Sequence, residues 1–138
     1  MQAVTTISST CRQQLIDYAL QQLPEEACGL LLAPIGSDTI TVMQPIANRH
    51  HSRVYAFTFD AEQWVHYYFH ASKLNLSVVG IFHSHPHEQP LPSEADMNGF
   101  FDQHMLYAII GFNQKESPQI RFYRRSKNRF IDFPLVLT

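Results

Sequence analysis

Residues 76–96 read LSVVGIFHSHPHEQPLPSEAD, and this stretch decides the fold of the chain. Its first ten residues are mostly apolar and turn polar only at the end, which predicts a buried strand over 76–85. The next seven residues, 86–92, include three prolines and predict a loop. Ser93 then begins a short third helix. That predicted helix bears Met97, Phe100 and Phe101.

Two histidines stand at the end of the predicted strand. Because side chains alternate along a strand, His83 and His85 project from the same face. Asp96 falls in the first turn of the next helix, and the intervening loop can fold it back towards the strand end. Two imidazoles and one carboxylate are the ligands of a catalytic zinc site, which keeps its fourth position for water. The stretch therefore predicts one Zn²⁺ per chain, bound by His83, His85 and Asp96.

The water of such a site needs a proton acceptor that is not itself a metal ligand. Glu25 and Glu26 stand where a predicted helix gives way to a buried strand. A carboxylate at this place is either solvated at the strand edge or faces a site. The residue pattern alone leaves both interpretations open.

Hydrophobic periodicity and turn residues predict the other elements. A helix over 10–23 is expected, with Thr10 and Gln13 as a capping box. The remaining strands are predicted at 27–35, 39–46, 54–59, 104–112, 119–125 and 129–137.

A second helix is expected after Asp60, which would cap it, with Phe59 packing on Trp64 across the cap. Its predicted apolar stripe is Trp64, Tyr67, Tyr68, Ala71 and Leu74. The order of all these elements predicts an α/β fold with a mixed central β-sheet flanked by helices.

Length and charge exclude several classes of protein. The chain has 138 residues, which suits one domain over 1–138. A net charge of −2 argues against nucleic acid or an anionic membrane as partner. We find no secretory signal and no apolar run long enough to span a membrane. Cys11 and Cys28 lie too far apart in sequence to suggest a disulfide framework, so a cytoplasmic protein is expected.

The segments Glu26-Ala27-Cys28-Gly29-Leu30, His83-Ser84-His85-Pro86 and Ser93-Glu94-Ala95-Asp96 together resemble the motif of the JAMM (MPN+) metalloproteases. The motif of that family is an upstream Glu, then His-Ser/Thr-His, seven residues, Ser, two residues and Asp. Every element occurs here at that spacing, and the resemblance covers about residues 8–130. The Glu-x-Cys-Gly context selects Glu26 over Glu25.

This resemblance implies a cytidine-deaminase-like fold, the MPN/JAB domain, and a small stand-alone zinc metallopeptidase of prokaryotic type. Glu26 would act as the general base, Ser93 would hydrogen-bond the oxyanion, and the two histidines with Asp96 would bind zinc. The implied substrate is the (iso)peptide bond after the C-terminal Gly-Gly of a ubiquitin-like or sulfur-carrier protein. An exposed strand edge at 54–58 is expected to pair with that extended tail.

Three other functions compete with this interpretation. A nucleobase deaminase shares the fold, but its His/Cys-x-Glu and Pro-Cys-x-x-Cys signatures are absent from the sequence. A RadC-like relative typically has Asn between the histidines, where this chain has Ser84. A non-catalytic MPN scaffold usually loses motif residues that this chain keeps. Metal content separates a scaffold from an enzyme, because a scaffold binds no stoichiometric zinc.

Histidines and a cysteine outside the motif have simpler interpretations. His66 and His70 share a polar helix face with Gln63 and Lys73, which indicates a solvated face. His50 and His51 are expected to be exposed in a polar loop. His87 either contacts substrate or lies free. Cys28 is expected to pack in the core.

Half of the basic residues lie within the nine positions 121–129. This cluster indicates either a solvated hairpin or a docking patch for an acidic protein partner. Its members are Arg121, Arg124, Arg125, Lys127 and Arg129.

Overall fold

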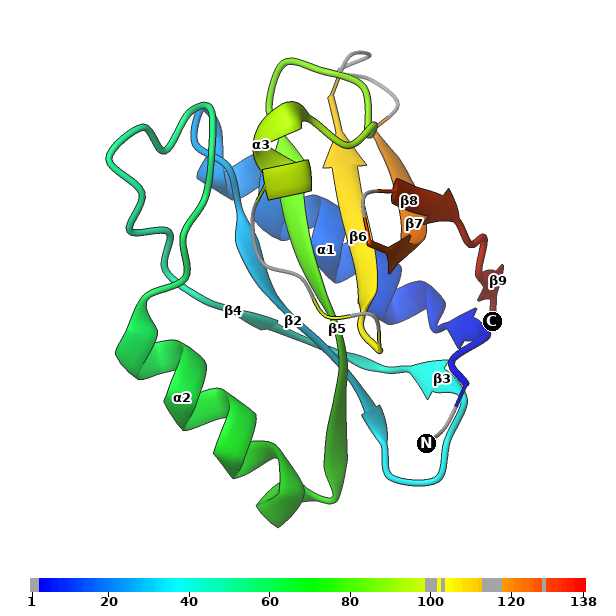
Figure 1. The fold of residues 1–138 in the computed structure, drawn as a ribbon. Helices are drawn as coiled ribbons and strands as arrows, with labels where there is room; N and C mark the ends of the chain where they lie inside the picture. Colours follow the sequence, from blue (N-terminus) through cyan, green and yellow to red (C-terminus); the bar gives the residue numbers. More distant parts are fainter. Residues whose placement is uncertain (1–2, 99–101, 103, 113–117, 128) are drawn as a thin grey trace.

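The computed structural model of the chain describes residues 3–98, 102, 104–112, 118–127 and 129–138. A six-stranded sheet, ordered β4-β2-β5-β6-β7-β8, forms its centre (Figure 1). The pair β5–β6 is parallel and the other pairs are antiparallel, which confirms the predicted mixed sheet. The strands are β2 (Cys28–Pro34), β4 (Val42–Pro45), β5 (Leu76–His85), β6 (Leu106–Gly111), β7 (Gln119–Ser126) and β8 (Arg129–Asp132).

A small parallel sheet, ordered β3-β1-β9, brings the two ends of the chain together. Its strands are β1 (Thr6–Ile7), β3 (Thr39–Ile40) and β9 (Val136–Leu137). The helices are α1 (Ser9–Gln22), α2 (Ala61–His70), the 3₁₀ helix η1 (Ala71–Leu74) and α3 (Glu94–Asn98). None of the helices in the described part of the chain has the length and apolarity that a membrane crossing requires.

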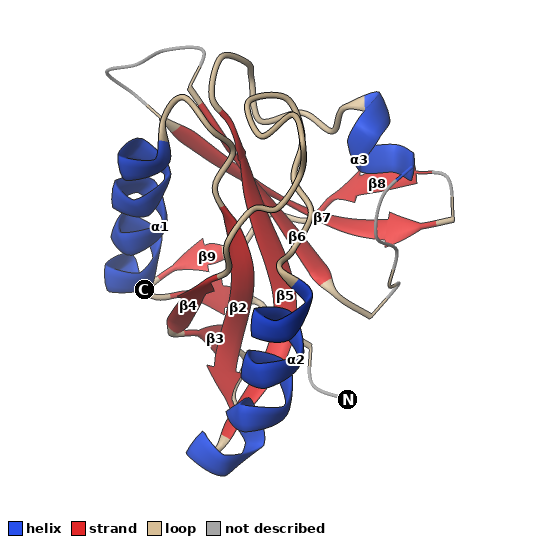
Figure 2. Cartoon of the chain, turned by 90° about the vertical axis from the view of Figure 1, so that its left-hand side faces the viewer, coloured by secondary structure: helices blue, strands red, loops and turns tan. Residues whose placement is uncertain are grey.

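The alternation of side chains divides the central sheet into two apolar faces. Figure 2 shows α1 on one side of the sheet and α2 and α3 on the other. On the first face, Leu15 of α1 belongs to the same buried cluster as Phe82 of β5. On the second face, Ile81 lies in a cluster against which Trp64 of α2 packs. His83 and His85 follow Ile81 at alternate positions, so they emerge on the face that α2 and α3 cover.

The start of α1 differs from the prediction. The helix begins at Ser9, and the Ser8 hydroxyl caps it by accepting a hydrogen bond from the Cys11 amide at 3.1 Å. Thr10 and Gln13 therefore do not form the capping box, and the side-chain amide of Gln13 instead donates to the Asp17 carboxylate at 2.9 Å. Ser8, two residues before Thr10, has the same hydroxyl chemistry, and it is Ser8 that lies at the N-cap position.

The predicted start of α2 is confirmed. The Asp60 carboxylate accepts from the Gln63 amide at 3.0 Å, and the rings of Phe59 and Trp64 stack at 5.6 Å. The apolar stripe is only partly correct, because Tyr68 is exposed together with Leu74.

The polar face of α2 is also partly as expected. His66 and His70 are exposed and stack on one another. Gln63 is half-buried instead of solvated, and its side-chain oxygen accepts from the Ala47 amide at 2.8 Å. This bond ties α2 to the loop that precedes it.

The strand predicted at 54–59, with its edge at 54–58, is wrong. These residues lie in a looped segment whose only described ladder contact is a bridge between Asn48 and Phe59. The Asn48 side-chain amide donates to the Ala56 carbonyl, and its oxygen accepts from the Thr58 amide, at 3.0 and 3.1 Å. The Asn48 side chain thus supplies two of the hydrogen bonds that a partner strand would make.

Two other predicted strands are each divided. The 39–46 segment breaks at Thr41 into β3 and β4, which belong to different sheets. The 129–137 segment likewise separates into β8 and β9. Phe100 and Phe101 of the predicted third helix lie outside the described residues.

Candidate active site

The site is built at the end of β5, between β2 and β6. His83 and His85 are 3% and 4% exposed, with their Nε2 atoms 3.2 Å apart. Asp96 of α3 lies against both, with its two oxygens 2.9 Å from His83 Nε2 and 3.0 Å from His85 Nε2. The structure therefore brings together the three side chains that the sequence singled out as ligands.

The spacing of these atoms fits a small tetrahedral metal ion. The three ligand atoms lie within 4.8 Å of one another. A tetrahedral zinc ion with bonds of about 2.0–2.1 Å separates its ligand atoms by about 3.3 Å. The observed distances are a few tenths of an ångström shorter, so the group can accept a zinc ion with a small outward adjustment.

A reciprocal helix cap orients the carboxylate of Asp96. The Ser93 amide donates to Asp96 Oδ2 at 2.8 Å, and the Asp96 amide donates to the Ser93 hydroxyl oxygen at 3.1 Å. This is the geometry of a capping box. The second bond uses a lone pair of the Ser93 oxygen, so it does not engage the hydroxyl proton.

The loop between β5 and α3 fixes the orientation of the His85 ring. His85 Nδ1 lies 3.1 Å from the Gln89 carbonyl oxygen. A carbonyl only accepts, so Nδ1 carries a proton, and this bond turns Nε2 towards the site. The loop packs tightly on β6, because a Cβ at Gly111 would lie 2.4 Å from Pro90.

Strand pairing brings the candidate base beside the ligands. Cys28 of β2 pairs with His83 of β5, and continuing this antiparallel register by two residues sets Glu26 beside His85. The motif glycine has a packing role here, since a Cβ at Gly29 would lie 2.2 Å from the Gln44 carbonyl oxygen. Glu26 is only 6% exposed, whereas Glu25 forms an ion pair with Arg53.

Burial controls the charge of Glu26. Desolvation raises its pKa from 4.5 to about 8, with Asp96 adding to the rise and His85 opposing it. Its Oε1 is buried and has no hydrogen-bond partner among the described residues. A buried carboxylate oxygen in this position has the chemistry of an acceptor for a proton from the site.

Asp96 and His85 shift each other towards their charged forms. Burial alone would raise the pKa of Asp96, but hydrogen bonds from His83 and His85 hold it well below its usual range. Burial likewise opposes protonation of His85, and the Asp96 carboxylate still raises its pKa. Asp96 is therefore held in its negatively charged form, which suits a residue that binds a cation.

The raised pKa predicts that Glu26 destabilises the metal-free fold. At pH 7 the unfolded chain ionises this carboxyl and the folded chain does not, so the folded state binds the extra proton and stability falls as pH rises from about 4.5 to about 8. We expect Glu26→Gln to raise the unfolding free energy of metal-free protein by about 3 kcal/mol at pH 7 and little at pH 4.

Denaturant unfolding of the metal-free proteins at the two pH values measures this difference. Glu25→Gln is the matched control, because Glu25 is partly exposed and paired with Arg53. A stability gain that is equal at pH 4 and pH 7 would contradict the ionisation mechanism.

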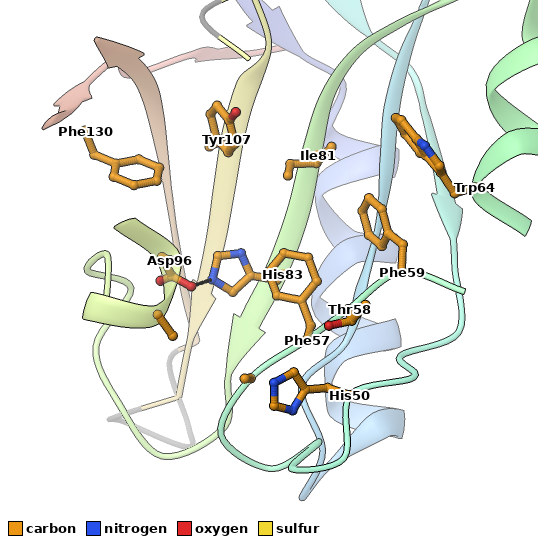
Figure 3. A pocket seen from close by; sticks show the side chains of 12 residues that line it. His50, Phe57, Thr58, Phe59, Trp64, Ile81, His83, Asp96, Tyr107 and Phe130 are labelled. Atoms are coloured by element: carbon orange, nitrogen blue, oxygen red, sulfur yellow. Dashed lines mark ion pairs between the residues drawn. The ribbon is translucent and has the colours of Figure 1, made fainter. Parts of the chain in front are cut away.

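An aromatic pocket of about 430 Å³ opens beside His83. Figure 3 shows the Phe57 ring against His83, with Tyr107 and Phe130 across the pocket. The Phe57 and His83 rings stack at 4.7 Å. The other lining residues are His50, Ala56, Thr58, Phe59, Trp64, Ile81, Ala95 and Asp96. This lining could not be predicted from the sequence, because its members are spread over the loop before α2 and over α2, β5, α3, β6 and β8, and they share no motif.

A smaller cavity, of about 80 Å³, lies on the other side of the site beside Glu26 and Ser93. His87 and Tyr55 contribute to its rim, and His87 is exposed. His50 is half-buried in the wall of the aromatic pocket, so the expectation that it is exposed is wrong.

The remaining candidates have structural positions. Cys28 is fully buried, its thiol donates to the Ile46 carbonyl at 3.3 Å, and burial raises its pKa to about 12. It therefore packs, as expected. The basic cluster is not one solvated hairpin, because Arg125 is only 7% exposed and Arg124 is half-buried.

Comparison with known proteins shows the family to which the chain belongs. Residues 8–126 match the family described as prokaryotic homologs of the JAB domain. A desampylase of Haloferax volcanii is 26% identical over 95 residues, which cover 66% of this chain and 68% of that relative. A CysO-cysteine peptidase of Mycobacterium tuberculosis is 24% identical over 121 residues, which cover 88% and 82%.

Solved structures agree on the fold. A protein from Desulfitobacterium hafniense has a TM-score of 0.85 and 27% identity, covering 96% of this chain and 92% of its own. A JAB1/MPN domain protein from Archaeoglobus fulgidus has a TM-score of 0.66 and 19% identity, with 99% and 100% covered. The chain belongs to the prokaryotic homologs of the JAB domain, within the JAMM/MPN family that its motif resembles.

Proposed function

We propose that this protein is a zinc metallopeptidase that hydrolyses the (iso)peptide bond after the C-terminal Gly-Gly of a ubiquitin-like or sulfur-carrier protein. The observation that carries the proposal is the buried group of His83, His85 and Asp96 beside Glu26, whose buried Oε1 has no hydrogen-bond partner among the described residues. Two imidazoles and one carboxylate match the donor set of catalytic zinc.

One zinc ion per chain would be held by His83, His85 and Asp96. When bound, zinc supplies a Lewis acid that polarises the scissile carbonyl and acidifies the attacking water. Asp96 enters this role ionised, because hydrogen bonds from both histidines lower its pKa. The cap with Ser93 and the bond from His85 to the Gln89 carbonyl keep two of the ligands oriented before any ion arrives.

Glu26 would take a proton from the attacking water and return it to the leaving amine. Its burial raises its pKa to about 8, which makes it a stronger base than a solvated carboxylate. With a cation held by the three ligands, that pKa would fall again, and Glu26 would be ionised near neutral pH. Glu26 is not a ligand, so it can move a proton without loosening the metal.

Ser93 would donate its hydroxyl proton to the developing oxyanion. Its oxygen accepts from the Asp96 amide, so this bond orients the hydroxyl and leaves its proton for the substrate. Both Ser93 and Glu26 line the small cavity beyond His85. This arrangement sets the two groups that act on the carbonyl and on the leaving amine in one place.

The choice of substrate is supported by the family and by the shape of the site. The Phe57 ring stacks on His83 at 4.7 Å beside the ligand group, and we expect residues without side chains, such as glycine, to fit there. The names of the matched relatives, desampylase and CysO-cysteine peptidase, agree with a hydrolase of this type.

Cleavage of a fusion between a ubiquitin-like carrier and a C-terminal peptide tests this proposal. Zinc-loaded protein is expected to cut after the second glycine of a Gly-Gly junction and to leave a Val-Val junction intact, because we expect the larger valine side chains to clash with the Phe57 ring. Mass spectrometry of the products identifies the bond. Cleavage that ignores the junction sequence would refute the proposed specificity, and a zinc-loaded protein that cuts no carrier fusion would refute the substrate class.

A further inference from the structure

The third ligand, Asp96, stands on an element that cannot hold itself in place. Helix α3 has five residues, and a helix this short is unstable in water without outside support. The two histidine ligands instead belong to a ten-residue strand that is paired on both sides. The geometry of the site therefore depends on whatever fixes α3 to the sheet.

Arg125 of β7 makes that connection. Its guanidinium donates to the carbonyl oxygen of Asp96 at 3.3 Å and to that of Met97. Hydrogen bonds from a guanidinium to a carbonyl are charge-assisted, so they are stronger than neutral ones. The side chain of Arg125 therefore supplies both hydrogen bonds and charge where α3 needs them.

The arginine is itself held in one orientation. Its Nε donates to the Lys127 carbonyl at 3.3 Å, and its guanidinium lies over the Phe130 ring at 5.2 Å. Phe130 is its cross-strand neighbour in the β7–β8 pair. Because Phe130 also lines the aromatic pocket, Arg125 connects the pocket wall to the ligand helix.

Two tyrosines of the same sheet face hold the flanks of this segment. The Tyr123 hydroxyl donates to the Pro90 carbonyl at 2.7 Å, ahead of α3. The Tyr107 hydroxyl bonds the backbone of Asp102 after it, accepting from the amide at 2.7 Å and donating to the carbonyl at 3.2 Å. Arg125 is the member of this set that contacts the backbone of the ligand itself.

We propose that Arg125 is a positioning residue for the metal site: it clamps the backbone of α3 so that the Asp96 carboxylate meets His83 and His85. This inference rests on the proposed zinc assignment. Arginine suits the task because its planar fork reaches two carbonyls at once, whereas the single ammonium of lysine does not.

The test measures the zinc dissociation constant of the metal-free full chain by competition with a chromophoric chelator. Arg125→Ala and Arg125→Lys are expected to bind zinc about 10–100-fold more weakly than the wild type, the usual effect of losing a group that supports a ligand. Lysine keeps the charge and much of the packing, so Arg125→Lys separates loss of the fork from loss of folding. Excess zinc is expected to restore carrier cleavage by Arg125→Lys.

Arg124→Ala is the matched control. Arg124 lies on the opposite face of β7, where its guanidinium contacts the Phe133 ring and donates to the His104 carbonyl. Its zinc affinity is expected to equal that of the wild type.

Three results would overturn the inference. Unchanged zinc affinity in a folded Arg125→Lys protein would show that the clamp does not position the ligand. Equal weakening by Arg124→Ala would show a general loss of sheet stability instead. A wild-type chain that binds no zinc would refute the proposed function itself, and this inference would fall with it.

Discussion

Replacing Glu26 with glutamine is expected to lower kcat for carrier cleavage by about 10²–10⁴-fold, the usual contribution of a general acid–base group. Zinc content should not fall, because Glu26 is not among the three ligand residues. The amide of glutamine fills the same buried volume but cannot accept the proton of the attacking water. Elemental analysis and steady-state kinetics on the same preparation measure both quantities.

Glu25→Gln serves as the control for this prediction. Glu25 is the neighbouring carboxylate, but it forms a partly exposed ion pair in which its Oε2 lies 3.2 Å from Arg53 Nε. Its substitution should leave kcat unchanged. Loss of zinc from Glu26→Gln would contradict the assignment of Glu26 as a base, since it would make that residue part of the metal-binding group.

Replacing His85 with alanine is expected to remove the metal. Wild-type protein purified without chelators should hold about one zinc per chain, and the variant close to none. Two remaining ligands bind zinc too weakly to survive purification, and Asp96 also loses one of the two hydrogen bonds that keep it ionised. Cleavage should disappear with the metal.

His70→Ala is the matched control, because His70 lies exposed on α2 and belongs to no metal group among the described residues. Zinc retained by His85→Ala would refute the assigned site. A wild-type protein without zinc would instead favour a binding scaffold of the same fold. Zinc present in the wild type, lost in His85→Ala and unaccompanied by carrier cleavage would preserve the site and refute the substrate.

The parts of the fold that the sequence predicted well are those with strong periodic signals. The bounds of β5 match the prediction at 76–85, because an apolar run ends there in polar residues. The ligand group followed from that strand, since alternation fixes the side on which His83 and His85 emerge. Asp96 needed only a loop long enough to turn back.

The missed features depend on contacts between distant segments. The prediction of a strand at 54–59 was wrong. The Asn48 side chain bonds two backbone groups of this segment, and no local sequence pattern predicts such bonds. Arg125 read as one more surface charge, because burial of an arginine is decided by the carbonyls it meets in the folded chain. The aromatic wall of the pocket was not predicted either, because the folded chain brings its residues together from separate segments.

His83 and His85 belong to a central strand that is paired on both sides, and Glu26 lies two residues before another such strand, whereas Asp96 is carried by a short helix. In the course of evolution, the proposed activity could therefore be lost without loss of the fold. Substitutions in α3 or at Arg125 would then remove the proposed activity while the sheet still folds, and the fold would persist as a binding module. Such a loss of activity would also be reversible, since few substitutions would separate the inactive protein from the active one.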